Sequence, residues 1–173
     1  MSVVESTCPG CKVVLPAFDG PTHAYMEASP ACWELFSRVL AREYGEPEYM
    51  AVHRLTVDGY AAQHPGRPEG RTIRSVNSHL VALHLSLDRR LEARFVTRII
   101  GVVVKRLKDD LVWLAPPESL GSITVADVAK VANAQSHRAA VRSWAGAVWS
   151  AWLPHRAAVL ALADKALSIG GAG

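Results

Sequence analysis

The sequence contains few of the features that mark secreted, membrane-spanning or nucleic-acid-binding proteins. Only 3 of its 173 residues are cysteine, an odd number that argues against a framework of disulfides. Its longest apolar run, IIGVVV at 99–104, is far too short to cross a bilayer, and MSVVESTCPG does not resemble a signal peptide. The formal net charge of +3 is spread along the chain without a basic run. We therefore expect a cytoplasmic protein with no membrane partner and no nucleic-acid partner.

Strand-like alternation of apolar and polar residues is also lacking, whereas helical spacing is abundant. Half of the residues are hydrophobic, and 173 residues are typical of one domain. We predict an all-α fold in which residues 1–173 form a single domain. Residues 30–169 are expected to be a helical bundle of about five to six helices, and residues 1–29 an irregular metal-binding arm that resembles a zinc knuckle.

The expected helix boundaries follow from capping and breaking residues. Ser29 and Pro30 are typical of an N-cap and a first helical residue, and Thr124 with Asp127 forms a capping-box-like start. Charges on both sides of IIGVVV favour a helix with one apolar face rather than a buried strand. The predicted helices span about 30–44, about 47–63 and Thr72 to Leu91, the last of which runs into or adjoins a fourth helix with Phe95 to Leu107. A long helix of about 124–152 and a last helix after Pro154 complete the prediction.

All three cysteines lie in a Pro- and Gly-rich stretch near the N-terminus. The turn Cys8-Pro-Gly-Cys11 can present two thiolates to one tetrahedral ion, and Cys32 at the start of a helix can supply a third. The nearest candidate for a fourth ligand is His23, which gives the pattern C-x2-C-x11-H-x8-C of a Cys3His zinc site. A redox CxxC would be expected near a βαβ pattern, which is lacking. The alternative is that Cys32 is a buried core residue and that the CxxC turn binds nothing.

A second group of polar side chains occupies the stretch AVHRLTVDGYAAQHPG at 51–66. At 100° per residue, His53, Tyr60 and His64 fall on one stripe of a helix that faces the apolar side, and Asp58 lies on its flank. His79 on the following helix also points inward. Such a group can hold a catalytic metal or act as acid and base. The alternative is that each histidine only satisfies a hydrogen bond in the core, for example with Asp58.

An aromatic stripe follows one face of the long helix predicted near the C-terminal end. Its members step by three or four positions, which is most typical of core packing. The stripe can also form the wall of an apolar substrate cavity. It consists of His137, Val141, Trp144, Val148, Trp152 and His155.

Several motifs carry a resemblance to a known family. CPGC, DGPTHAYMEASPACW, AREYGEPEYMAVHRLTVDGYAAQHPG, SITVADV and WAGAVWSAW resemble an uncharacterised bacterial family that has no assigned activity. The resemblance spans most of the chain and implies a cytoplasmic bacterial protein with the CPxC, DGPTHxY and HRLTVDxYxxQHPG motifs as its signature. The sequence departs from that pattern at Lys12, where Gly usually follows the knuckle. It departs again at Arg156, where a second histidine often follows His155, and this weakens a ligand role for that pair.

These patterns favour a zinc-binding helical protein that acts on a small molecule. The cysteine group would be structural, and a pocket with His53, Tyr60, His64 and His79, together with Asp58, would support a metal-assisted hydrolase or transferase reaction. If His23 is not the fourth zinc ligand, then one of His53, His64 and His79 completes the site. The catalytic hypothesis would then lose most of its basis.

Two further hypotheses belong to other classes of function. A non-enzymatic module that binds a protein partner predicts an exposed apolar patch along Trp144 and Trp152. A thiol redox or metal-sensing protein predicts reactive thiols at Cys8 and Cys11. The sequence favours a metal-dependent enzyme of unknown reaction, and it indicates neither the substrate nor the oligomeric state.

Overall fold

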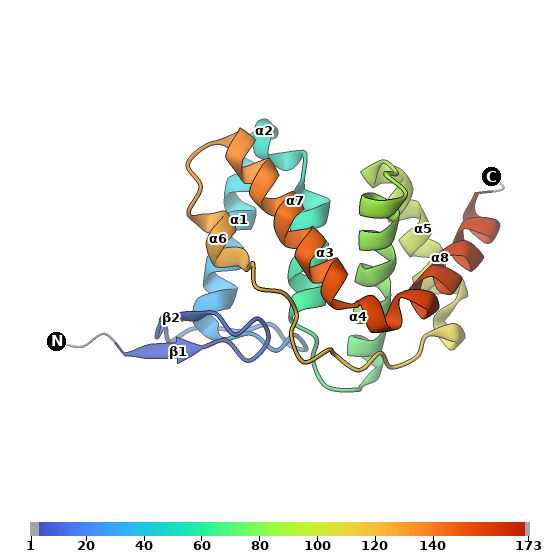
Figure 1. Cartoon of the computed structure of the whole chain (residues 1–173), viewed down its shortest axis with the longest axis horizontal. Helices are drawn as coiled ribbons and strands as arrows, with labels where there is room; N and C mark the ends of the chain where they lie inside the picture. The colour runs from blue at the N-terminus through green and yellow to red at the C-terminus, as the bar shows by residue number, and fades with distance from the viewer. Residues whose placement is uncertain (1–3, 172–173) are drawn as a thin grey trace.

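The computed structural model describes residues 4–171 and is mainly helical, which confirms the all-α prediction (Figure 1). A small hairpin of two strands precedes the helices. The strands are β1 (Glu5–Thr7) and β2 (Val14–Pro16), and the helices are α1 (Pro30–Gly45), α2 (Pro47–Met50), α3 (His53–Gln63), α4 (Gly70–Leu83), α5 (Ala93–Arg106), α6 (Val125–Ala129), α7 (Ala134–Ala151) and α8 (Arg156–Gly170).

The N-terminal arm is more regular than the sequence indicates. Strands β1 and β2 pair antiparallel, with Ser6 opposite Leu15, so the expectation that no segment is a strand was wrong here. Each strand has three residues, too few to show a pattern of alternation. The CPGC turn connects the two strands and is closed by backbone hydrogen bonds from Cys8 N to Val13 O (2.9 Å) and from Lys12 N to Cys8 O (3.0 Å).

The helices form two groups that contact each other in the middle of the molecule. The helices α1, α3, α6 and α7 lie next to the arm, whereas α4, α5 and α8 lie toward the opposite end (Figure 1). The helix α3 packs against α4 and α7, α1 packs against α6, and α5 packs against α8. The buried hydrophobic side chains form a continuous cluster from Cys8 in the arm to Ala166 in α8. The cysteines of the arm are therefore part of the main core.

Two helices begin where the capping signals predict. The Ser29 side chain accepts a hydrogen bond from Cys32 N (3.2 Å), with Pro30 at the first helical position of α1. At α6, Thr124 N donates to the Asp127 carboxylate (2.9 Å), which confirms the capping box. The IIGVVV run lies in α5 as a helix, as its charged flanks indicate.

Two of the predicted long helices are interrupted. The stretch 47–63 divides into α2 and α3, and the stretch 124–152 divides into α6 and α7. The second break occurs because Asn133 acts as an N-cap, its side chain accepting a hydrogen bond from Ser136 N (2.9 Å). At the end of α4 the chain continues as one turn of π-helix, η1 (His84–Asp88).

The aromatic stripe belongs to the core from His137 to Trp152, whereas His155, beyond the end of α7, is half-buried. Trp144 and Trp152 are fully buried, and their indole N–H groups donate to Gln63 Oε1 (2.8 Å) and to Ala62 O (3.0 Å). The apolar surface patch that a protein-interaction module would present along these two residues does not exist. No helix within residues 4–171 combines the length and the apolar character needed to cross a bilayer.

Candidate metal centre

Three thiols and one imidazole converge between the arm and the first helices. The Sγ atoms of Cys8, Cys11 and Cys32 and a ring nitrogen of His64 all lie within 4.8 Å of one another. The four residues are buried, and Cys11 is the most exposed at 6%. Within the described part of the chain, no other group of His, Cys, Asp and Glu side chains meets in this way.

The separations agree with those in a tetrahedral zinc site. Two thiolates bound to one zinc ion at about 2.3 Å lie about 3.8 Å apart, and a thiolate and an imidazole nitrogen lie about 3.6 Å apart. In the structure, Cys11 Sγ is 3.8 Å from Cys32 Sγ, and Cys32 Sγ is 3.4 Å from His64 Nε2. The sulfurs are far beyond the bonding distance of a disulfide, and all three cysteines are free. The centre can therefore hold a metal ion.

Each ligand is positioned by local structure. The hairpin turn presents Cys8 and Cys11, while the first turn of α1 presents Cys32, and Ser29 N donates a hydrogen bond to Cys8 Sγ (3.5 Å). His64 follows the last residue of α3, and its Nδ1 lies 2.8 Å from Tyr60 O. This carbonyl fixes Nδ1 as the protonated nitrogen, so that Nε2 is directed toward the sulfurs as a ligand.

The glycine of the CPGC turn allows the arm to lie against His64. A Cβ atom on Gly10 would come within 2.5 Å of Glu27 O and 2.6 Å of His64 Cδ2. Real Cβ atoms do not approach backbone oxygens so closely, and thus only glycine fits. Next to the turn, Lys12 has a φ of 63°, in the left-handed region that glycine adopts most readily.

The three thiols shift one another's ionisation. Hydrogen bonds from Cys11 and from Cys32 hold the pKa of Cys8 far below its usual value. Hydrogen bonds to Cys11 and Cys8, together with burial, raise the pKa of Cys32 well above it. For Cys11, the hydrogen bond from Cys32 favours the thiolate, but the bond to Cys8 and burial outweigh it and raise the pKa to about 12. One thiolate forms readily, and a bound cation is needed to stabilise all three.

His23, which sequence spacing favours as the fourth ligand, lies outside this group. Its ring packs edge-on against Tyr25 and Trp33, with centroid distances of 4.4 and 5.0 Å, and Tyr25 N donates to its Nδ1 (3.4 Å). Burial among these rings lowers the pKa of His23. His64 occupies the position expected for His23. His23 is nearer to the cysteines in sequence, but His64 is nearer to them in space.

Tyr60 supports the centre and is closed to solvent. Its ring is stacked between Phe36 (3.7 Å between centroids) and His64 (3.9 Å), and its hydroxyl donates to Cys32 Sγ (3.6 Å). Burial, and then the charge of Cys32, raise the pKa of this phenol. Tyr60 therefore hydrogen-bonds to one candidate ligand, Cys32, and stacks on another, His64. It does not face a substrate pocket.

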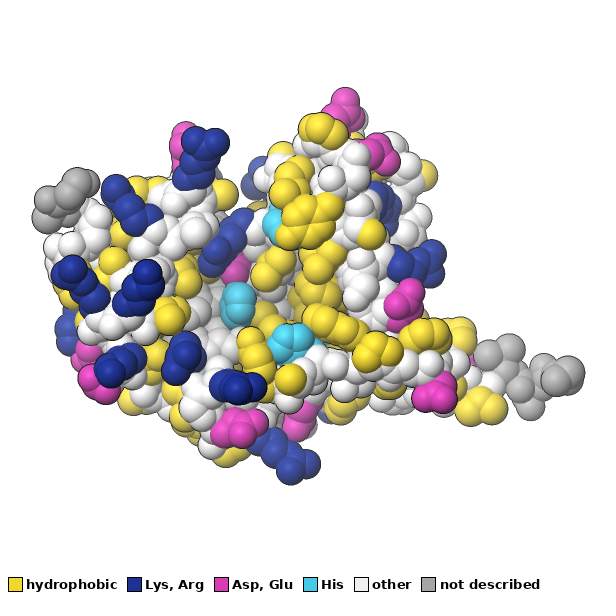
Figure 2. Space-filling view, turned by 180° about the vertical axis from the view of Figure 1, so that it is seen from behind, with side chains coloured by type: hydrophobic (Ala, Val, Ile, Leu, Met, Phe, Trp, Pro, Cys, Tyr) yellow, Lys and Arg dark blue, Asp and Glu magenta, His cyan; other side chains and the backbone are white. Residues whose placement is uncertain are grey.

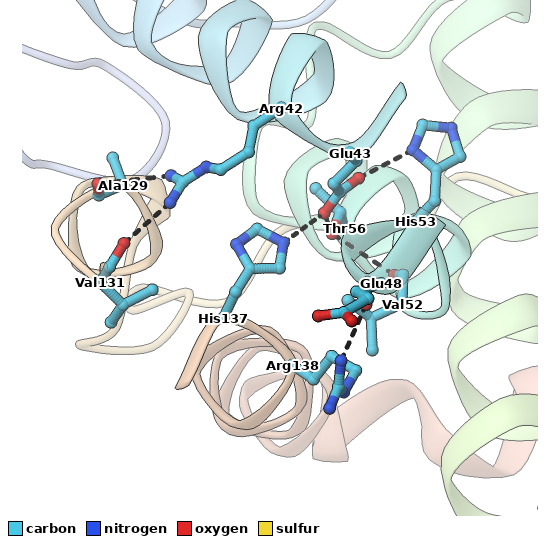
Figure 3. Close-up of polar contacts among 10 residues, drawn as sticks. All are labelled: Arg42, Glu43, Glu48, Val52, His53, Thr56, Ala129, Val131, His137 and Arg138. Atoms are coloured by element: carbon cyan, nitrogen blue, oxygen red, sulfur yellow. Dashed lines mark hydrogen bonds and ion pairs between the residues drawn. The ribbon is translucent and has the colours of Figure 1, made fainter. Parts of the chain in front are cut away.

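His53 belongs to a separate buried network around Glu43. The Glu43 carboxylate is fully buried on α1 and contacts His53 Nδ1 (2.8 Å), Thr56 Oγ1 (2.5 Å) and His137 Nε2 (2.8 Å), as Figure 3 shows. These partners come from α3 and α7, so the network joins three helices. The sequence does not indicate this network, because nothing near Glu43 distinguishes it from a surface glutamate of α1.

His79 and Asp58 form a third, distinct pair. The buried carboxylate of Asp58 contacts His79 Nδ1 (2.7 Å) through one oxygen, and it accepts a hydrogen bond from Arg54 Nε (2.7 Å) through the other. The expected pocket of His53, Tyr60, His64 and His79 is thus not one site. The structure brings His64 and Tyr60 to the cysteines, His53 to Glu43, and His79 to Asp58.

The fold and this centre define a helical protein with a buried Cys3His candidate metal site. The chain belongs to a family of unknown function, DUF5946, whose model matches residues 6–153. That range includes all four side chains of the candidate centre. Comparisons with curated proteins and with solved structures found no match.

Proposed function

We propose that the protein binds one zinc ion through Cys8, Cys11, Cys32 and His64, and that this ion has a structural role. The observation that carries the proposal is the convergence of four buried soft ligand atoms within 4.8 Å. The ion would join three segments, namely the hairpin of the arm, the start of α1 and the end of α3. It would stabilise the arm on the bundle, where three thiols in a reducing cytoplasm cannot rely on disulfides.

The donor set favours zinc over other metals. Three thiolates and one imidazole in tetrahedral spacing are typical of structural zinc, whereas magnesium and calcium prefer oxygen ligands and most iron–sulfur clusters use four cysteines. The hydrogen bond of His64 Nδ1 to a backbone carbonyl is also the support that zinc-bound histidines commonly have.

The four-ligand arrangement does not favour a metal-assisted reaction at this centre. Catalytic zinc keeps a coordination position for water or substrate, whereas four protein ligands leave none. The other expected catalytic histidines, His53 and His79, are bound to different carboxylates. A thiol redox role has little support either, because reactive cysteines are partly exposed and these three are buried.

Metal analysis of purified variants tests the proposal. We expect one zinc per chain in the wild type and in the matched control His23→Ala, and loss of zinc in Cys8→Ser and His64→Ala. His64→Cys is expected to retain one zinc, because four cysteines also form structural zinc sites. This variant distinguishes loss of a ligand from a general failure to fold. Zinc that persists in folded His64→Ala and is lost from His23→Ala would overturn the assignment, as would a wild type without bound metal.

A further inference from the structure

A cavity of about 480 Å³ lies along α4 and is also lined by residues of α3, of α5 and of the segment that carries Tyr25. One face of α4 supplies much of its lining, with residues at positions 71, 74, 75, 78 and 79, and α3 contributes Arg54. Figure 2 shows a hollow that contains a histidine side chain and has Lys and Arg side chains along its border. The volume is within the range of small-molecule sites.

The charge of this cavity has one sign. Arg54, Arg71 and Arg74 line it, and no acidic side chain does. The charge of Arg54 is offset by Asp58, which lies behind it at 2.7 Å. Within residues 4–171, Arg71 and Arg74 form neither an ion pair nor a hydrogen bond. Two like charges three positions apart on a helix repel each other, and a bound anion would relieve that repulsion.

Two residues of the lining carry polar atoms that have no protein partner in the described chain. Ser78 is 6% exposed, and its buried hydroxyl has no hydrogen-bond partner, although the residue lines the cavity. A buried hydroxyl usually has a partner, and a ligand oxygen in the cavity would supply one if the Ser78 side chain turned toward it. His79 uses Nδ1 on Asp58 and leaves Nε2 without a protein partner in the described chain. The Asp58 contact fixes the orientation of the ring relative to the cavity.

The geometry points to a binding site for a small phosphate monoester, with the phosphoryl group between Arg71, Arg74 and Ser78. A phosphoryl group carries up to two negative charges and three acceptor oxygens, which match two guanidinium groups and a hydroxyl better than a single carboxylate does. The organic part of the ligand would contact the Tyr25 ring and the aliphatic side chains of Ile100 and Val104, which complete the lining. None of the residues that line this cavity is one of the four candidate ligands of the metal centre.

Binding of phenyl phosphate to the full-length, metal-replete protein tests the proposal by calorimetry and by amide chemical shifts. We expect saturable binding with shifts centred on Ser75 and Ser78. In the double variant Arg71→Gln/Arg74→Gln the affinity should fall about tenfold or more, because two charge-assisted contacts are lost. The matched control is Arg94→Gln/Arg106→Gln, two exposed positions of α5 with the same change in net charge, and its affinity should stay within about twofold of the wild type.

Three comparisons complete the experiment. Inorganic phosphate should compete with phenyl phosphate, phenol should not bind, and benzoate should bind more weakly. The proposal is overturned if phenyl phosphate does not bind, if the Arg94→Gln/Arg106→Gln control loses as much affinity as the cavity variant, or if phenol or benzoate binds as well. Tighter binding of a single-stranded oligonucleotide, with shifts that extend beyond the cavity, would instead assign this face to nucleic acid.

Discussion

His64 Nε2 lies 3.4 Å from Cys32 Sγ, although the two residues are 32 positions apart in the chain. The contact closes a loop that begins at the first turn of α1 and ends after the last residue of α3. It therefore connects α3, the helix that carries Tyr60 and Gln63, to the start of α1. Cys32 Sγ also lies 3.8 Å from Cys11 Sγ in the hairpin turn, so the two contacts together connect α1, α3 and the hairpin.

Gly10→Ala is predicted to disrupt the metal centre without removing a ligand. The added methyl group would meet Glu27 O and the His64 ring at 2.5 and 2.6 Å, so the turn must move away from His64. We expect weaker zinc retention against a chelator and a lower melting temperature. Gly70→Ala is the matched control, because a Cβ atom there has no neighbour within 4 Å. Equal zinc retention in both variants would show that the turn does not need this close approach.

Glu43→Ala is predicted to destabilise the protein by about 3–5 kcal/mol, because it leaves three donors on two other helices, two of them fully buried, without their acceptor. Those donors are His53, Thr56 and His137. Urea unfolding measures the change, with Glu34→Ala on the exposed side of α1 as the control. Zinc content should stay at one per chain in both variants, since the network is separate from the cysteines. A loss smaller than about 1 kcal/mol would mean that water replaces Glu43 readily.

Asp88→Asn is predicted to lower stability by about 1 kcal/mol at neutral pH and by less in acid. Partial burial opposes ionisation of Asp88, but hydrogen bonds from His84, Arg156 and Trp149 outweigh it and hold the pKa of this carboxyl below its usual value of 3.8. A lowered pKa stabilises the fold above the unfolded value, and that contribution is lost as the pH falls through the folded value. The difference between wild type and variant should therefore shrink below about pH 4.

Unfolding at a series of pH values checks this dependence, and Asp164→Asn serves as the control. Asp164 is exposed, and its only close cation in the described chain is Arg89 at 3.8 Å. Its substitution should have little effect at any pH. A difference for Asp88→Asn that stays constant from neutral pH to pH 3 would contradict the assignment.

The sequence predicts elements whose signals are local. The N-cap at Ser29, the capping box at Thr124 and the helical periodicity of 99–104 depend on neighbours within one or two turns, and the structure agrees with each. The break before α7 was also encoded locally, by Asn133 three residues before Ser136. The expectation of a single helix from 124 to 152 overlooked it because the apolar spacing continues on both sides.

The candidate site shows where local reasoning fails. The spacing of Cys8, Cys11 and Cys32 brings them together by a turn and a helix start, both of which are visible in the sequence. The choice of histidine depends on how the end of α3 packs against the hairpin, which no spacing rule specifies. The same holds for Asp58 with His79, where the partners come from different helices.

All four residues of the candidate metal centre lie within the first 64 residues of the chain. During synthesis, the hairpin, α1 and α3 are complete before α4 and the helices that follow it have been made. A zinc ion at the proposed site would thus bind to the nascent chain early and stabilise a preformed N-terminal unit. The helices α4 to α8 would then add to a surface that is already ordered.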